Sequence, residues 1–195
     1  MGEEKESVKM KKLLLVIDYQ NDFVSGSLGF EEARALENAI CAKIEAYQAA
    51  GDAVMCTLDT HSEDYLQTQE GKKLPVPHCL KDSEGWKIYG KAAALLEKCQ
   101  KFEKPVFGSS ALFDYLRSAR YESIELCGVV SNICVLSNAV IARTAQPETE
   151  IIVDAACVAS NDPDLNSAAL AVLGSLQVTI CLLYTSPSPR DMRRS

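Results

Sequence analysis

The stretch GVVSNICV, residues 128–135, places a cysteine shortly after the end of an apolar run. That run, Ile124 to Val129, is typical of a buried strand, and Asn132 to Thr144 reads as a helix. A helix N-terminus presents free N–H groups and a positive dipole potential, which favour a thiolate and can hold an oxyanion. The alternative for Cys134 is a small buried residue that begins a core helix. Other parts of the chain must decide between the two.

Strand and helix patterns alternate along the whole chain. Strands are predicted at Lys12–Ile17, Ala53–Leu58, Pro105–Phe107, Ile124–Val129, Glu150–Val153 and Val178–Ile180. Helices are predicted at Glu31–Ala50, Lys91–Lys98, Ala111–Ser118, Asn132–Thr144 and Asp162–Leu173. This alternation predicts a three-layer, doubly wound α/β fold with a parallel sheet. Sites in such folds lie beyond the carboxyl ends of the strands, where Asp18, Asp59 and the Cys134 turn are expected.

Length and composition narrow the class of protein. The chain has 195 residues, enough for one α/β domain with a sizeable core. A net charge of −7 without a basic cluster inside the domain argues against a nucleic-acid partner. No apolar run approaches the roughly 18 residues of a membrane span, and no secretory signal is present. The eight cysteines are scattered without a CxxC pair, which indicates reduced thiols in a cytoplasmic protein.

The two ends of the chain differ from its centre. We expect residues 1–10, which are polar and charged, to be a disordered lead-in, and residues 11–180 to form the domain. The stretch CLLYTSPSPRD at residues 181–191 resembles the translation of a sequencing-library transposase adapter. We therefore expect residues 181–195 to be a non-native tail, with the natural sequence cut near Ile180. A genuine Ser/Pro/Arg-rich tail is the alternative.

The long polar segment from Thr60 to Tyr89 carries both histidines of the chain. A loop of this length inside a compact domain is usually functional or disordered. Asp59 and His61 share one side of an extended segment, and Glu70 and His78 follow within reach. Two imidazoles and two carboxylates suit Zn²⁺, Mn²⁺ or Fe²⁺ better than Ca²⁺. The alternative is a solvated loop whose histidines are incidental.

If Cys134 is a nucleophile, its base is not expected to be histidine, because both histidines are candidate metal ligands. Asp18 ends a buried strand, and burial or nearby acidic groups can raise the pKa of such a carboxylate into a useful range. Lys104, in the stretch FEKPVFGS, can stabilise a thiolate and anionic intermediates. Taken alone, Lys104 is more typical of a surface lysine than of a catalytic one.

Four motifs occur in order: LLVIDYQNDF, DTH, KPVFGS and GVVSNICV. From about Lys12 to Ile180 this combination resembles the isochorismatase-like cysteine hydrolases, and among them the nicotinamidase-related amidases. The resemblance implies a six-stranded parallel sheet and a catalytic triad of Asp18, Lys104 and Cys134. It also implies a cis peptide between Val129 and Val130, with the N–H groups of Val130 and Cys134 forming an oxyanion hole.

The resemblance also implies a metal site and a substrate pocket. Nicotinamidases bind a metal beside the substrate, and Asp59, His61 and His78 match the ligands directly, whereas Glu70 fits a variant with a glutamate before the last histidine. Phe23 resembles a ring-packing residue, and Val129 is expected in the pocket. Many relatives carry an aromatic residue just before the Pro-Pro-His of their metal site, where this chain has Leu74-Pro75-Val76-Pro77-His78.

We therefore expect a metal-containing amidohydrolase that cleaves a small carboxamide through a thioester, with nicotinamide as the leading substrate. Zn²⁺ is the leading metal, with Mn²⁺ or Fe²⁺ as alternatives. Hydrolysis of another amide or ureide, such as an N-carbamoyl compound, is the alternative within enzymes. A non-catalytic or redox-responsive binding module is the alternative outside them. Relatives are commonly oligomeric, so a homo-oligomer without nucleic-acid or membrane partners is expected.

Overall fold

A computed structural model describes residues 10–181 of the chain. Apart from Met10 and Cys181, the expected lead-in and tail lie outside the described residues. Six parallel strands form one sheet in the order β3-β2-β1-β4-β5-β6. The strands are β1 (Leu13–Ile17), β2 (Ala53–Asp59), β3 (Gln100–Lys104), β4 (Ser123–Val129), β5 (Glu150–Ala159) and β6 (Thr179–Cys181). The predicted α/β fold with a six-stranded parallel sheet is therefore confirmed.

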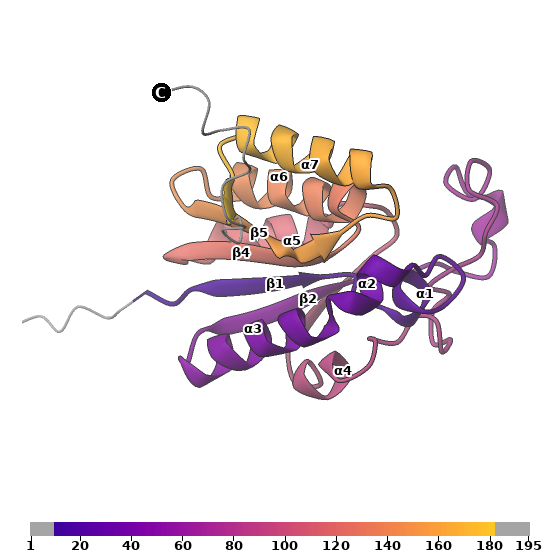
Figure 1. Ribbon diagram of the computed structural model, residues 1–195, viewed down its shortest axis with the longest axis horizontal. Coiled ribbons are helices and arrows are strands. Elements are labelled where there is room, and N and C mark those ends of the chain that lie inside the picture. Colours follow the sequence, from indigo (N-terminus) through magenta and orange to yellow (C-terminus); the bar gives the residue numbers. More distant parts are fainter. Residues whose placement is uncertain (1–9, 182–195) are drawn as a thin grey trace, which may run out of the picture.

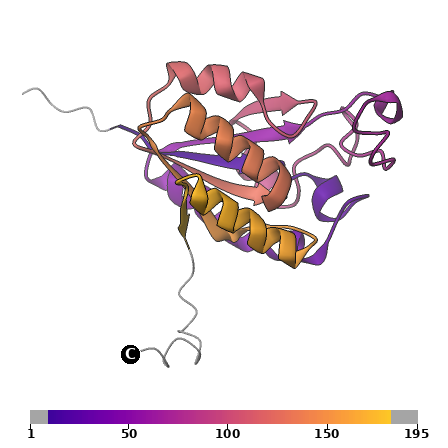
Figure 2. The same cartoon turned by 90° about the horizontal axis from the view of Figure 1, so that it is seen from above.

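Helices cover both faces of the sheet (Figure 1). One face carries α2 (Glu31–Ala35), α3 (Glu37–Ala49) and α4 (Ala92–Leu95). The other face carries α5 (Ser110–Ser118), α6 (Leu136–Ala145) and α7 (Pro163–Ser175), which lie side by side in Figure 2. The short α1 (Asn21–Val24) follows β1. No helix among the described residues is long and apolar enough to cross a membrane.

The continuous apolar sequence of β1 follows from its place at the centre of the sheet. Leu13, Leu15 and Ile17 pack against the α5–α7 layer, whereas Leu14 and Val16 pack against the α3 layer. Side chains alternate across a strand, so a strand buried on both faces needs apolar residues at every position. Each such side chain contributes about 1.5–3 kcal/mol by burial.

The structure corrects two predicted strands. The strand predicted at Pro105–Phe107 is wrong: β3 lies just before it, at Gln100–Lys104, and ends where Pro105 follows. This edge strand lacks an apolar run by which it could be predicted, because only Phe102 and Lys104 are buried in it. The strand predicted at Glu150–Val153 continues to Ala159, because β5 pairs with β4 again after an irregularity in the register.

Three predicted helices also differ from the structure. The segment Glu31–Ala50 forms two helices rather than one, with the break at Leu36. The helix predicted at Lys91–Lys98 is reduced to Ala92–Leu95. The helix predicted from Asn132 begins instead with a π-helical turn, Ser131–Val135, and continues as α6.

The sheet brings the candidate residues to one edge. Asp18 follows β1 with a φ of +46°, Asp59 ends β2, and Lys104 ends β3 as the direct partner of Asp59. Near the end of β4, Gly128 has a φ of +113°, and a Cβ atom there would lie 2.1 Å from the Ile17 carbonyl oxygen. Only glycine permits this close approach of β4 to β1 directly before the Cys134 turn.

Candidate active site

Asp18, Lys104 and Cys134 converge in the interior of the protein. The Lys104 Nζ lies 2.7 Å from the Asp18 Oδ2 and donates to the Cys134 Sγ across 3.7 Å. Their side chains come from three different segments of the chain and are at most 5% exposed. The Thr57 hydroxyl donates to the Asp18 Oδ1 across 2.7 Å, which fixes the carboxylate from the neighbouring strand.

Burial sets the protonation of these groups. It raises the pKa of the Cys134 thiol well above its usual value, with Asp18 adding to the effect and Lys104 opposing it. Burial also raises the pKa of Asp18, although the nearby Lys104 ammonium group acts to lower it. Burial alone would lower the pKa of Lys104, but Asp18, Cys134 and Asp59 raise it above its usual value. Burial thus opposes the thiolate that a helix N-terminus was predicted to favour at Cys134.

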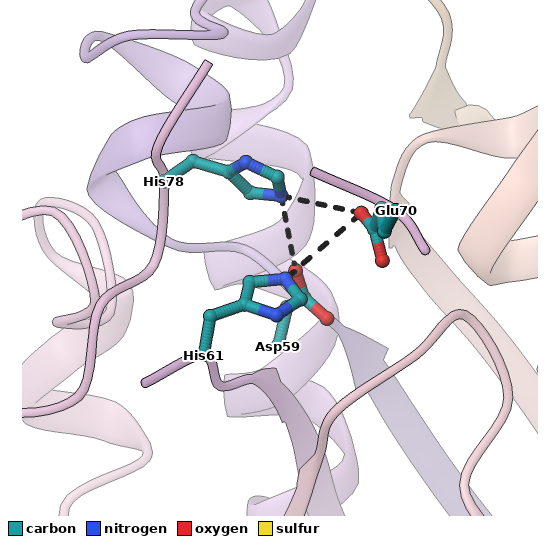
Figure 3. Close-up of side chains that lie close together, drawn as sticks. All are labelled: Asp59, His61, Glu70 and His78. Carbon is teal, nitrogen blue, oxygen red and sulfur yellow. Dashed lines mark hydrogen bonds and ion pairs between the residues drawn. The ribbon is translucent and has the colours of Figure 1, made fainter. Parts of the chain in front are cut away.

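Four candidate metal ligands lie beside this group, at the carboxyl end of β2 and in the long loop after it (Figure 3). The Asp59 Oδ2 lies 2.9 Å from the His61 Nε2 and 3.4 Å from the His78 Nε2. The Glu70 Oε1 lies 3.9 Å from the His61 Nε2 and 3.6 Å from the His78 Nε2. All four ligand atoms lie within 4.8 Å of one another.

This arrangement fits a divalent transition metal. Tetrahedral ligands at about 2.0–2.2 Å from a metal are about 3.3–3.6 Å apart, which lies within the 2.9–3.9 Å spanned by the four distances above. The buried Glu70 Oε2 has no hydrogen-bond partner among the described residues. Burial raises the pKa of Glu70, and the Asp59 carboxylate facing it raises that pKa further. A cation would balance both carboxylates.

Local contacts orient the ligand side chains. The ring Nδ1 of His78 lies 2.9 Å from the Val76 carbonyl oxygen, which leaves the Nε2 facing Asp59 and Glu70. The His61 backbone N–H donates to the Cys79 carbonyl oxygen across 3.0 Å. The long segment predicted to be either functional or disordered is therefore ordered around the ligands.

A cavity of about 470 Å³ adjoins both groups of residues. Its walls are Phe23, Ser27, Leu28, Gly29, Phe30, Asp59, Glu70, Leu74, His78, Phe107, Val130, Ile133, Cys134 and Asn161. Phe23 lines this cavity as expected of a pocket residue. Val129 does not: it is fully buried in the core on the α3 side, and Val130 takes its place on the wall.

The turn that carries Cys134 contains the cis peptide that the resemblance implies. The peptide between Val129 and Val130 is cis. Val130 and Cys134 both line the cavity, and no backbone carbonyl among the described residues accepts a hydrogen bond from the Val130 N–H.

Sequence reasoning missed Gln20, which is fully buried. Its Nε2 donates to the Asp59 carbonyl oxygen across 2.9 Å, and its Oε1 accepts from the Asp59 N–H across 2.8 Å. Gln20 therefore fixes the backbone of a candidate metal ligand from the segment that follows Asp18. A polar residue just beyond a buried strand was the available signal, but its partner could not be read from the sequence.

Comparison with known proteins places this geometry in context. Residues 12–182 match the isochorismatase domain. An uncharacterized isochorismatase family protein, PncA, from Bacillus subtilis (strain 168) is 35% identical over 143 residues, covering 67% of this chain and 78% of the relative.

Solved structures are similar over most of the chain. The nicotinamidase PncA from Bacillus subtilis has a TM-score of 0.79 at 31% identity, covering 89% of this chain and 100% of that one. The pyrazinamidase/nicotinamidase from Streptococcus mutans UA159 also has a TM-score of 0.79, at 30% identity over 87% and 99% of the two chains. The pyrazinamidase of Pyrococcus horikoshii in complex with zinc shares the fold, with a TM-score of 0.76 at 21% identity over 89% and 99%.

Proposed function

The chain belongs to the isochorismatase family of hydrolases, and from that premise we propose that it is a metal-dependent cysteine amidase that converts nicotinamide into nicotinate and ammonia. One observation carries the proposal. A buried carboxylate and an ammonium group meet a buried thiol that lines a cavity, and three of the four candidate metal ligands, Asp59, Glu70 and His78, line the same cavity. The similar structures named nicotinamidase agree with this substrate.

We assign to Asp18 the role of general base and acid. Its carboxylate takes the Cys134 proton as the sulfur attacks the amide carbon, and Lys104 balances the negative charge of the group. The carbonyl oxygen becomes an oxyanion, which the N–H groups of Val130 and Cys134 hold. Asp18 then returns the proton to the nitrogen, the C–N bond breaks, and ammonia leaves a thioester on Cys134.

Water completes the reaction. It attacks the thioester carbon while Asp18 accepts one of its protons, the C–S bond breaks, and the sulfur regains a proton from Asp18. The raised pKa of Asp18 suits this alternation, because the group must give up a proton as readily as it takes one.

The metal is assigned to Asp59, His61, Glu70 and His78. Two nitrogen and two oxygen ligands favour Zn²⁺, with Mn²⁺ or Fe²⁺ as alternatives. When bound there, the metal would supply a Lewis acid beside the cavity for the ring nitrogen of the substrate. Phe23 and Phe107 offer aromatic walls around the ring.

The cavity favours a neutral ring amide over the alternative ureides. N-carbamoyl amino acids carry a carboxylate, which needs a cationic partner when it is buried. No lysine or arginine lines the cavity among the described residues, and the charge of a divalent metal beside it would already be balanced by the carboxylates of Asp59 and Glu70. The remaining walls are mainly apolar, as a pyridine or pyrazine ring requires.

Ammonia release tests the proposal. The purified protein, supplied with Zn²⁺, would be given nicotinamide, pyrazinamide and an N-carbamoyl amino acid in parallel. We expect turnover of the two ring amides at rates at least about tenfold above the ureide. Preferred turnover of the ureide would contradict the substrate, and no turnover of any amide by folded, metal-loaded protein would favour a binding module.

A further inference from the structure

Asn138 is a fully buried amide on α6 that no step of the reaction uses. Its Nδ2 donates to the Cys134 carbonyl oxygen across 2.8 Å and to the Phe107 carbonyl oxygen across 3.0 Å. Its Oδ1 accepts from the Ser109 N–H across 3.1 Å. One side chain thus joins the turn that carries the thiol to the loop that follows Lys104.

That loop lies at the surface. Pro105, Val106 and Phe107 are all exposed, and Phe107 is 41% exposed although it lines the cavity. One end of the loop is fixed at Lys104, whose carbonyl oxygen accepts from the Thr60 N–H across 2.9 Å. The other end is fixed at Ser109, by Asn138.

The backbone beyond Phe107 lies close against α6. A Cβ atom on Gly108 would lie 2.7 Å from the Cδ1 of Ile141, one turn along α6 from Asn138. Ser109 then begins α5, where its hydroxyl accepts from the Leu112 N–H across 3.1 Å. The three hydrogen bonds of Asn138 therefore set the path of the chain between β3 and α5 relative to the Cys134 turn.

We propose that Asn138 is a positioning residue that holds Cys134 and the Phe107 wall of the cavity at a fixed distance from each other. This inference rests on the proposed function for its kinetic consequence, since a cavity of fixed shape beside the thiol matters only if a substrate reacts there. Its structural part, the tie between the two segments, is independent of the substrate.

Gln146 provides a matched control at the far end of the same helix, about 12 Å away along its axis. It is also a buried amide, 5% exposed. Its Nε2 donates to the Leu116 and Ala119 carbonyl oxygens, and its Oε1 accepts from the Thr149 hydroxyl. It thus makes the same number of hydrogen bonds without touching the cavity.

The test compares Asn138→Ala with Gln146→Ala, both assayed well below their melting temperatures. We expect both variants to be less stable than the wild type. Only Asn138→Ala should lose about 10- to 100-fold in kcat/KM, because a displacement near 1 Å in an active site has an effect of this size. Gln146→Ala should stay within about twofold. Equal kcat/KM values in the two variants would overturn the inference and leave Asn138 with a purely stabilising role.

Two further measurements separate this inference from the choice of substrate. Hydrogen exchange of peptides spanning residues 105–110 should be faster in Asn138→Ala than in Gln146→Ala. The alkylation rate of Cys134 by iodoacetamide should change in Asn138→Ala alone. If neither differs between the variants, the inference fails whatever the substrate is. Should Asn138→Ala not fold, Asn138→Ser replaces it, because the hydroxyl and the space left for water satisfy part of the lost hydrogen bonds.

Discussion

Two clusters in this molecule combine a lysine, two carboxylates and a cysteine. The active-site cluster consists of Asp18, Asp59, Lys104 and Cys134, and the α3 cluster consists of Lys43, Glu125, Asp154 and Cys157. In the first, the Lys104 Nζ lies 2.7 Å and 3.2 Å from its two carboxylates. In the second, the Lys43 Nζ lies 2.5 Å and 2.8 Å from its own. The two clusters are thus alike in composition and ion pairing.

Their surroundings differ. Cys134 lines the cavity, whereas Cys157 does not. The Cys157 thiol instead donates to the Asp154 Oδ2 across 3.6 Å. The Asp154 Oδ1 accepts from the Ala156 N–H across 2.9 Å, within the irregular part of β5. The α3 cluster joins α3 to residues within β4 and β5, and the active-site cluster lies at the carboxyl ends of the strands. The comparison teaches that place in the sheet, and not the set of residue types, decides which of the two clusters adjoins the cavity.

Replacing the two cysteines should give the largest difference. Cys134→Ala removes the proposed nucleophile, so ammonia release from nicotinamide should fall by about 10⁴-fold or more. Cys157→Ala should retain activity within about threefold. Similar activities for the two variants would mean that the comparison assigns the wrong roles.

Replacing the two lysines should separate activity from stability. Lys104→Met should lower kcat by about 10²–10³-fold. The substitution removes the positive charge that balances the Asp18 carboxylate and the negative charge of the oxyanion intermediate. Lys43→Met leaves Glu125 and Asp154 facing each other without a cation, so unfolding in urea should become easier by about 3 kcal/mol. At low temperature its kcat should stay near that of the wild type. A large loss of kcat in folded Lys43→Met would remove the distinction.

Metal binding should distinguish the clusters further, since histidines adjoin only the first. Zn²⁺ at about 100 times its dissociation constant should stabilise the wild type by about 2.7 kcal/mol. Glu70→Gln should weaken Zn²⁺ binding at least about tenfold, and the exposed Glu84→Gln and the α3-cluster variant Asp154→Asn should not. Metal content by mass spectrometry and thermal melting with and without Zn²⁺ measure this. Unchanged affinity in Glu70→Gln would exclude Glu70 as a ligand.

The smallest effect concerns pH. Burial alone would raise the pKa of Asp154, but hydrogen bonds from Lys43 and the Ala156 N–H lower it below its usual value. The stability that this carboxylate provides is therefore present above its unfolded pKa, about 3.9, and is lost as the pH falls through its lower folded pKa. The free energy of unfolding, measured with urea, should fall less steeply in Asp154→Asn than in the wild type between about pH 5 and about pH 3. This range brackets the unfolded pKa of about 3.9. Identical pH slopes would show that Asp154 does not contribute this way.

The sequence predicted those parts of the fold that depend on local pattern. Leu13–Ile17 is apolar throughout and forms the central strand, and the carboxyl ends of the strands hold the candidate residues, as parallel-sheet geometry requires. The edge strand β3 was misplaced because its sequence QKFEK has little apolar character. The extension of β5 was missed because Asp154 interrupts its apolar run and is held by Lys43, a partner far away in the chain.

Site residues could be predicted from the sequence where their type and spacing indicate a chemical role. Residues that act only through contacts with other segments could not. Asp59, His61, Glu70 and His78 were assigned from residue type and spacing, and their ligand atoms lie together in the structure. Asn138 resembles any polar residue in a helix, because its partners are backbone atoms of other segments. The roles of Lys104 and Cys134 in catalysis are predictions that the experiments above test, and the role of Asp18 stays a prediction.

Partitioning of the reaction between water and hydroxylamine tests the central claim, a thioester on Cys134, most directly. Hydroxylamine attacks thioesters, so wild-type protein given nicotinamide should form nicotinohydroxamate, and nicotinate plus hydroxamate should together equal the ammonia released. Neither product should form with Cys134→Ala. Ammonia release without hydroxamate at any hydroxylamine concentration, or hydroxamate formation by Cys134→Ala, would contradict the account.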